Sequence, residues 1–145
     1  MSLHLRTRLP ALTQSLADEE PSVVARLIGQ VRIAIGVVVL LAPRAATRRF
    51  LRAEDAAPDA LTAWRMAGVR DVALGLGTVM AARKASPSLR GWVEASALAD
   101  AGDVYAFSRD GAFYPVLRAA AGLTAGALAG VGIWTARRLG DPDPE

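Results

Sequence analysis

The chain of 145 residues has no cysteine, one histidine, one lysine and few aromatic residues. The absence of cysteine excludes a disulfide scaffold and any zinc, iron–sulfur or thiol chemistry that needs cysteine. The single histidine, His4, leaves no pair of imidazoles for a metal or haem site. The sequence therefore predicts no catalytic residue, no metal site and no cofactor, and it favours a protein that is not an enzyme.

The charge and apolar content narrow the class further. The net charge is +3, but the 16 arginines are scattered through apolar stretches rather than gathered with aromatic residues, so nucleic acid is not an expected partner. Hydrophobic residues make up 52% of the chain, including 30 alanines, which excludes intrinsic disorder. The chain must therefore bury a large apolar surface, in a core or in a membrane.

Four apolar segments divide the chain, at residues 22–42, 60–82, 89–108 and 116–136. A helix of about 21 residues covers roughly 31 Å, close to the thickness of a bilayer core. Asp59 stands at an N-cap position and Pro115 in a first helical turn, and no segment has the pattern of a strand. The sequence predicts an all-α fold: one membrane domain over 1–145, with four transmembrane helices in an antiparallel bundle between the tails 1–21 and 137–145.

A soluble four-helix bundle is the alternative, because the mean hydropathy is only +0.28 and most segments carry charge. Such a bundle shows charges at every turn of each outer face. Residues 33–42 and 119–136 have no charge at all, which favours a membrane. The first 20 residues lack the apolar region of a cleavable signal peptide. Four spans make a multi-pass protein with both termini on one side of the membrane. The excess of basic residues on that side predicts that the termini are cytoplasmic. The predicted location is the bacterial inner membrane.

The first two segments contain an internal repeat. Residues 26–36 align without gaps with residues 65–75, sharing R-x-x-G-x-x-(charge)-(I/V)-A-(I/L)-G. Neighbouring antiparallel helices give such a repeat inverted topology, a plan that many transporters use. Arg32 and Asp71 hold equivalent positions at the midpoints of their spans, which predicts an ion pair between them. Removing one partner leaves a buried charge unpaired, whereas exchanging the two charges preserves neutrality and should restore part of the stability that either single replacement removes.

Glycines at helical spacing mark the predicted packing faces, because small residues let helix backbones approach closely. For the last three of them the sequence leaves open whether the face serves the bundle or a dimer. The predicted packing glycines are Gly29, Gly36, Gly68, Gly75, Gly122, Gly126 and Gly130.

Charged residues within the spans predict an intramembrane polar network. Ser96, Asp100, Asp103 and Phe107 share one helix face, and a lone charge at mid-bilayer costs roughly 2.5–3.5 kcal/mol, so the aspartates need partners. By depth, Arg70 and Arg65 are the expected partners of the aspartates. The predicted network comprises Arg32, Arg65, Arg70, Asp71, Glu94, Asp100 and Asp103.

The runs 32–43, 65–77 and 98–103 together resemble a family of small uncharacterised four-helix membrane proteins, a domain of unknown function of high-GC Gram-positive bacteria. G-x-R-D and D-A-x-D are its sharpest motifs, and residues 26–108 carry the likeness. A more distant architectural similarity links the chain to DoxX-type membrane proteins, which are associated with membrane redox complexes. The resemblance implies a membrane bundle and leaves the activity open.

Three functions are compatible with these features. The leading hypothesis is a non-enzymatic accessory or scaffold subunit, in which the charge network fixes the helix register and the partners are the lipid bilayer and another membrane protein or a second copy. A small transporter or a proton- or ion-conducting homo-oligomer is the second, with the network as a pathway or as a pocket for a proton, ion or lipid headgroup. A lipid-modifying enzyme is the third, but the Mg²⁺-diphosphate enzymes of membranes need more carboxylates than the Asp100–Asp103 pair supplies.

Overall fold

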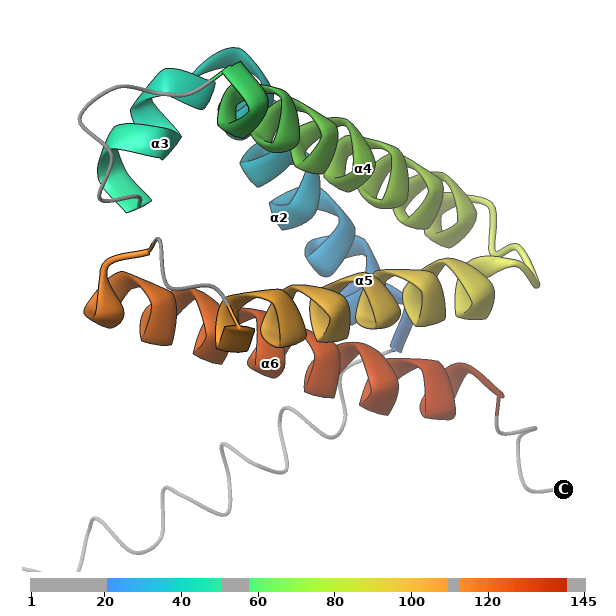
Figure 1. Ribbon diagram of the computed structural model, residues 1–145. Helices are drawn as coiled ribbons and strands as arrows, with labels where there is room; N and C mark the ends of the chain where they lie inside the picture. The colour runs from blue at the N-terminus through green and yellow to red at the C-terminus, as the bar shows by residue number, and fades with distance from the viewer. Residues whose placement is uncertain (1–20, 51–57, 110–112, 141–145) are drawn as a thin grey trace, which may run out of the picture.

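The computed structural model describes residues 21–50, 58–109 and 113–140, and within these ranges it is helical, with no strand (Figure 1). The predicted all-α class is confirmed. The helices are α2 (Pro21–Leu41), α3 (Pro43–Phe50), α4 (Pro58–Arg83), α5 (Leu89–Arg109) and α6 (Pro115–Gly140). Residues 1–20 and 141–145 of the two predicted tails lie outside the described residues.

Each of the four predicted segments is a helix. The bounds of α2, α4 and α5 lie within two residues of the prediction, and α6 continues four residues further, through Arg137 and Arg138. These basic side chains suit the last turn, because the helix dipole places partial negative charge there.

The short helix α3 was not predicted from the polar segment after residue 42. Pro43 supplies the fixed φ of a first helical turn, and the Thr47 hydroxyl donates to the Pro43 carbonyl at 3.0 Å. Pro43 and Thr47 are buried while Arg44, Arg48 and Arg49 are exposed. The sequence pattern is therefore amphipathic at a length too short for a hydropathy search to detect.

The long helices form two hairpins. The most extensive contacts join α2 to α4 and α5 to α6, and fewer contacts join the two hairpins to each other. One end of the molecule holds the start of α2, the α4–α5 turn and the end of α6, while α3 and the start of α6 lie at the other end (Figure 1). Phe50, Trp64, Phe107 and Phe113 form an aromatic cluster at that second end, with ring centroids 5.2–6.3 Å apart.

Glycine sets the close approach of α2 and α4. A Cβ atom added to Gly75 would lie 2.6 Å from the Gly29 carbonyl oxygen, and one added to Gly36 would lie 2.7 Å from the Gly68 oxygen. The contacts are reciprocal, since a Cβ atom on Gly29 or Gly68 would meet the same partner at 2.9 or 2.8 Å. The packing role predicted for these four glycines is therefore seen directly in the backbone distances.

The three glycines of α6 differ from this prediction. Nothing lies within 4 Å of a Cβ atom added to Gly122 or Gly130, and Gly126 meets only the Val104 side chain at 3.8 Å. Instead, Gly132 of α6 lies against α5, where an added Cβ atom would be 3.0 Å from the Ala97 Cβ atom, and Ala125 and Ala129 of α6 are buried. Of the two roles that the sequence leaves open, the described residues show no close packing of these glycines within the bundle, because α6 turns a different face to α5, and a dimer face stays a prediction.

The distribution of apolar side chains is unusual. Among residues 21–50, 58–109 and 113–140, ten apolar residues are buried, of which six are alanine, whereas nineteen large apolar residues are exposed. Of the helices in the described ranges, only α2 and α6 are long and apolar enough to cross a membrane, and only 22% and 17% of their most apolar windows is buried. The helices α4 and α5 are long enough, but their charged residues make them too polar to be identified as membrane spans by composition. Length and composition therefore support two of the four predicted spans.

Candidate functional site: a buried arginine–aspartate network

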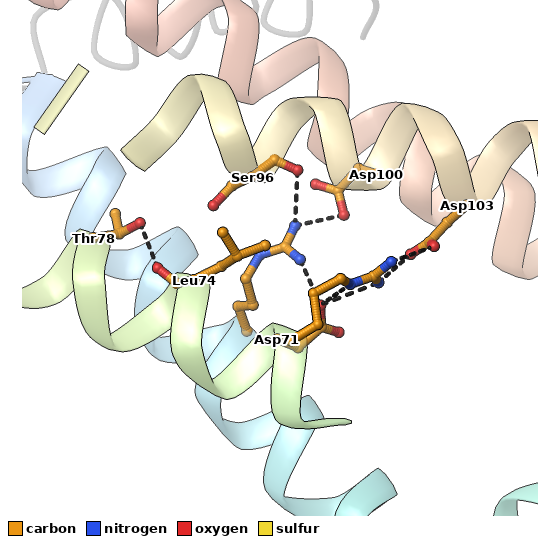
Figure 2. Close-up of polar contacts among 8 residues, drawn as sticks. Asp71, Leu74, Thr78, Ser96, Asp100 and Asp103 are labelled. Carbon is orange, nitrogen blue, oxygen red and sulfur yellow. Dashed lines mark hydrogen bonds and ion pairs between the residues drawn. The ribbon is translucent and has the colours of Figure 1, made fainter. Parts of the chain in front are cut away.

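Arg32 joins three helices in the interior. It lies in α2 with its side chain 5% exposed, and its guanidinium donates to Asp71 of α4 at 2.8 Å and to Asp100 of α5 at 2.5 Å. It also donates to the Ser96 carbonyl oxygen at 3.4 Å (Figure 2). The predicted Arg32–Asp71 ion pair is therefore present, and Asp100 is a second partner of the same guanidinium.

Arg70 extends the network toward the aromatic end. Its guanidinium forms a bidentate ion pair with Asp103, donating to Oδ1 at 2.9 Å and to Oδ2 at 2.8 Å, which is the geometry that best matches a carboxylate. It also donates to Asp71 at 3.2 and 3.3 Å. The chain of contacts runs from Asp103 through Arg70, Asp71 and Arg32 to Asp100, as the dashed lines in Figure 2 show.

The helix register explains these positions. Ser96 and Asp100 are buried while Asp103 and Phe107 are half-buried, as their common face on α5 predicts. Gly68 and Gly75, each within one helical turn of Asp71, bring α4 close to α2, so that the Arg32 side chain reaches Asp71 and continues to α5.

The network contains one more negative than positive charge. Two guanidiniums face three carboxylates when all five groups are ionised. Within the described chain, no hydrogen bond reaches Oδ2 of Asp71 or Oδ2 of Asp100, since both aspartates accept only through Oδ1. The Arg32 Nε and Ser96 Oγ atoms are buried with no hydrogen-bond partner. The cluster therefore keeps unused acceptors and an excess negative charge in a largely apolar interior.

A cavity of about 370 Å³ opens onto this network between α2, α5 and α6. Arg32, Asp71, Asp100 and Asp103 line its polar part. The rest of the lining is mainly apolar and includes Ile28, Val31, Ile35, Phe50, Phe107 and Leu128. The volume lies within the range of small-molecule pockets.

Two residues of the predicted network lie elsewhere. Arg65 is exposed on α4, beside Thr62, Met66 and Val69, and within the described residues it forms no ion pair with an aspartate of the network. Glu94 is about half exposed and pairs with Arg90 one turn earlier on α5 at 2.7 Å. Depth along the helices suggested both, but depth does not fix the direction around the helix axis.

Sequence reasoning missed the Ser96 carbonyl and the cavity. A backbone acceptor has no sequence pattern, and the cavity forms where residues of five helices meet. The part of the chain that the structure describes has no cluster of three or more His, Cys, Asp or Glu side chains arranged to hold a metal.

Comparisons with protein-family models, curated proteins and solved structures give no match to this chain.

Proposed function

We propose that the chain is a multi-pass membrane protein of four spans, in which the Arg/Asp network locks two helix hairpins together. The proposal is based on the distribution of side chains, which is the reverse of that in a water-soluble protein. Large apolar residues such as Leu41, Leu98 and Val116 are 75–79% exposed, while the described interior consists mainly of small residues, hydroxyls and ion pairs with few large apolar side chains. Small residues and polar contacts between helices are typical of membrane proteins, where the lipid solvates the outer apolar surface.

The same distribution is unfavourable in water. Burying a large aliphatic or aromatic side chain contributes about 1.5–3 kcal/mol, and a water-soluble monomer rarely leaves a continuous apolar surface over several helices. The apolar exposed residues occur on α2, α4, α5 and α6 alike. A bilayer on all sides of the bundle accounts for this better than one partner on one face.

The charges of α4 and α5 are compatible with spanning. Asp59 and Arg83 lie in the first and last turns of α4, and Arg109 ends α5. The charges near the middle of these helices, Arg70, Asp71, Asp100 and Asp103, are all in ion pairs. Pairing lowers the cost of placing charge at membrane depth, which supports four spans although α4 and α5 are too polar to be identified singly.

Reciprocal contacts support an inverted repeat in α2 and α4. Gly29 contacts Gly75 and Gly36 contacts Gly68, so each glycine of one copy meets the non-equivalent glycine of the other. The equivalent residues Arg32 and Asp71 meet between these pairs. A two-fold relation between antiparallel helices produces this pattern.

We expect the full-length protein to remain in the membrane pellet after alkaline carbonate treatment and to be released by detergent. The exposed apolar surface of four helices is the physical reason. Immunoblotting of pellet and supernatant measures the partition, with a known peripheral membrane protein as the control that carbonate releases. Recovery of a monodisperse soluble protein without detergent would contradict the membrane proposal.

Within the membrane, the network supports a scaffold or accessory subunit rather than an enzyme. Its ion pairs tie α2 to α4 and α5, and every arginine and aspartate in it is engaged with at least one other member. The proposed partners are the lipid bilayer and another membrane protein, in the bacterial inner membrane with both termini in the cytoplasm.

Affinity purification of the tagged protein from native membranes in a mild detergent tests the scaffold role. A different membrane protein retained in fixed stoichiometry supports it. Recovery of the chain alone as a homo-oligomer would contradict it and favour the second candidate, a small transporter, for which the cavity beside the network is the specific observation.

A further inference from the structure

We propose that the cavity between α2, α5 and α6 binds an organic cation with an apolar body, such as a primary amine, which enters from the lipid phase. The inference rests on the proposed membrane location and goes beyond the scaffold role. It assigns a ligand class to a cavity that the locking function does not need.

The charge of the lining selects a cation. Asp71, Asp100 and Asp103 face the cavity together with one guanidinium, Arg32, and the whole network has one negative charge in excess. Asp71 and Asp100 keep Oδ2 free of hydrogen bonds, so an ammonium group has two acceptors that need no rearrangement of the ion pairs. An anion would meet three carboxylates at the same place.

The apolar residues that line the cavity favour a ligand whose uncharged part is apolar. Ile28, Ile35 and Leu128 supply aliphatic surface, and Phe50 and Phe107 supply aromatic rings in the same cavity. Aromatic faces also attract cations, which adds to the charge selection. A small inorganic cation would gain no binding energy from this apolar surface. The described residues also offer no set of three acidic ligands converging on one point.

The mouth of the cavity faces outward between α2 and α6. Val31 is 50% exposed and Ile35 is 43% exposed on the α2 side, and Thr124 and Ala120 are exposed on the α6 side. In a bilayer these residues contact lipid. An amphiphilic amine dissolved in the membrane therefore reaches the carboxylates without crossing the bundle.

Matched probes test the proposal. The full-length protein in nanodiscs of phosphatidylcholine, which carries no net charge, is titrated at neutral pH with 4-phenylbutylamine, 4-phenylbutanol and 4-phenylbutyrate, and binding is followed by calorimetry against empty nanodiscs. We expect the amine to bind at least tenfold more tightly than the alcohol or the acid. Equal binding of amine and alcohol would overturn the proposal.

Two variants locate the binding. Asp100→Asn removes the excess charge and is expected to weaken amine binding at least tenfold. Thr124→Phe fills the mouth without changing charge and is expected to abolish binding. Glu94→Gln, on the exposed face of the same helix, is the matched control and should bind as the unchanged protein does.

The variants also keep the proposal falsifiable if Asp100→Asn does not fold. Unchanged amine affinity in Thr124→Phe would overturn it in either case. Carbonate extraction is independent of these titrations, so a protein that stays in the membrane and does not bind the amine refutes the cation site and leaves the membrane proposal intact.

Discussion

Replacing Arg32 with methionine is expected to lower the free energy of unfolding by about 3–5 kcal/mol, because it leaves buried carboxylates without their partner. Asp100 loses its guanidinium altogether, and Asp71 keeps only the longer contacts with Arg70. Arg32→Lys should recover little of the loss, since an ammonium group lacks the planar fork that reaches two carboxylates and the Ser96 carbonyl together. Reversible unfolding in mixed micelles measures both variants.

Arg26→Met is the matched control for this prediction. Arg26 lies on the same helix but is exposed, and its replacement is expected to change stability by less than about 0.5 kcal/mol. If Arg32→Met and Arg26→Met have the same small effect, the network does not hold the hairpins together.

The structure changes one expectation that the sequence suggests. If Arg32 paired with Asp71 alone, exchanging the two charges would restore part of the stability. Because Asp100 also binds the Arg32 guanidinium, the exchange brings two carboxylates together on α2 and α5 and places a second arginine beside Arg70. The exchanged protein should therefore be no more stable than the worse single variant.

The helices could be predicted because the features that define them lie close together in the sequence. Apolar runs of bilayer length and prolines at their borders located α2, α4, α5 and α6 within a few residues of their bounds. The helix α3 was missed because eight polar-rich residues are too few to show a period. The number of membrane spans could not be predicted in this way, since the partners of the charges in α4 and α5 come from neighbouring helices.

The predicted site was partly right for a related reason. The repeat placed Arg32 opposite Asp71, and the three-residue spacing placed Asp100 and Asp103 on one face of α5. Spacing along one helix does not show how that helix is rotated toward its neighbours. For that reason Arg65 was assigned to the network although it is exposed in the structure, and the sequence did not decide which face of α6 packs on α5.

The second large effect is expected at the contact of α2 and α4. Gly75→Ala adds a Cβ atom 2.6 Å from the Gly29 carbonyl oxygen and 2.7 Å from the Ile33 side chain. Backbone atoms on the facing helix cannot turn aside as a side chain does, so the helices must separate. Overpacking of this kind typically costs about 1–3 kcal/mol, and here the helix shift also lengthens the Arg32–Asp71 contact.

Gly126→Ala is the matched control, and it should raise the free energy of unfolding rather than lower it. Its Cβ atom meets only Val104 at 3.8 Å, so the change mainly exchanges a poor helix former for a good one, which contributes up to about 1 kcal/mol in favour of folding. Unfolding of both variants in the same micelles measures the difference. Loss of stability in Gly126→Ala with none in Gly75→Ala would show that the α6 glycines, rather than the α2–α4 contact, form the close helix interface.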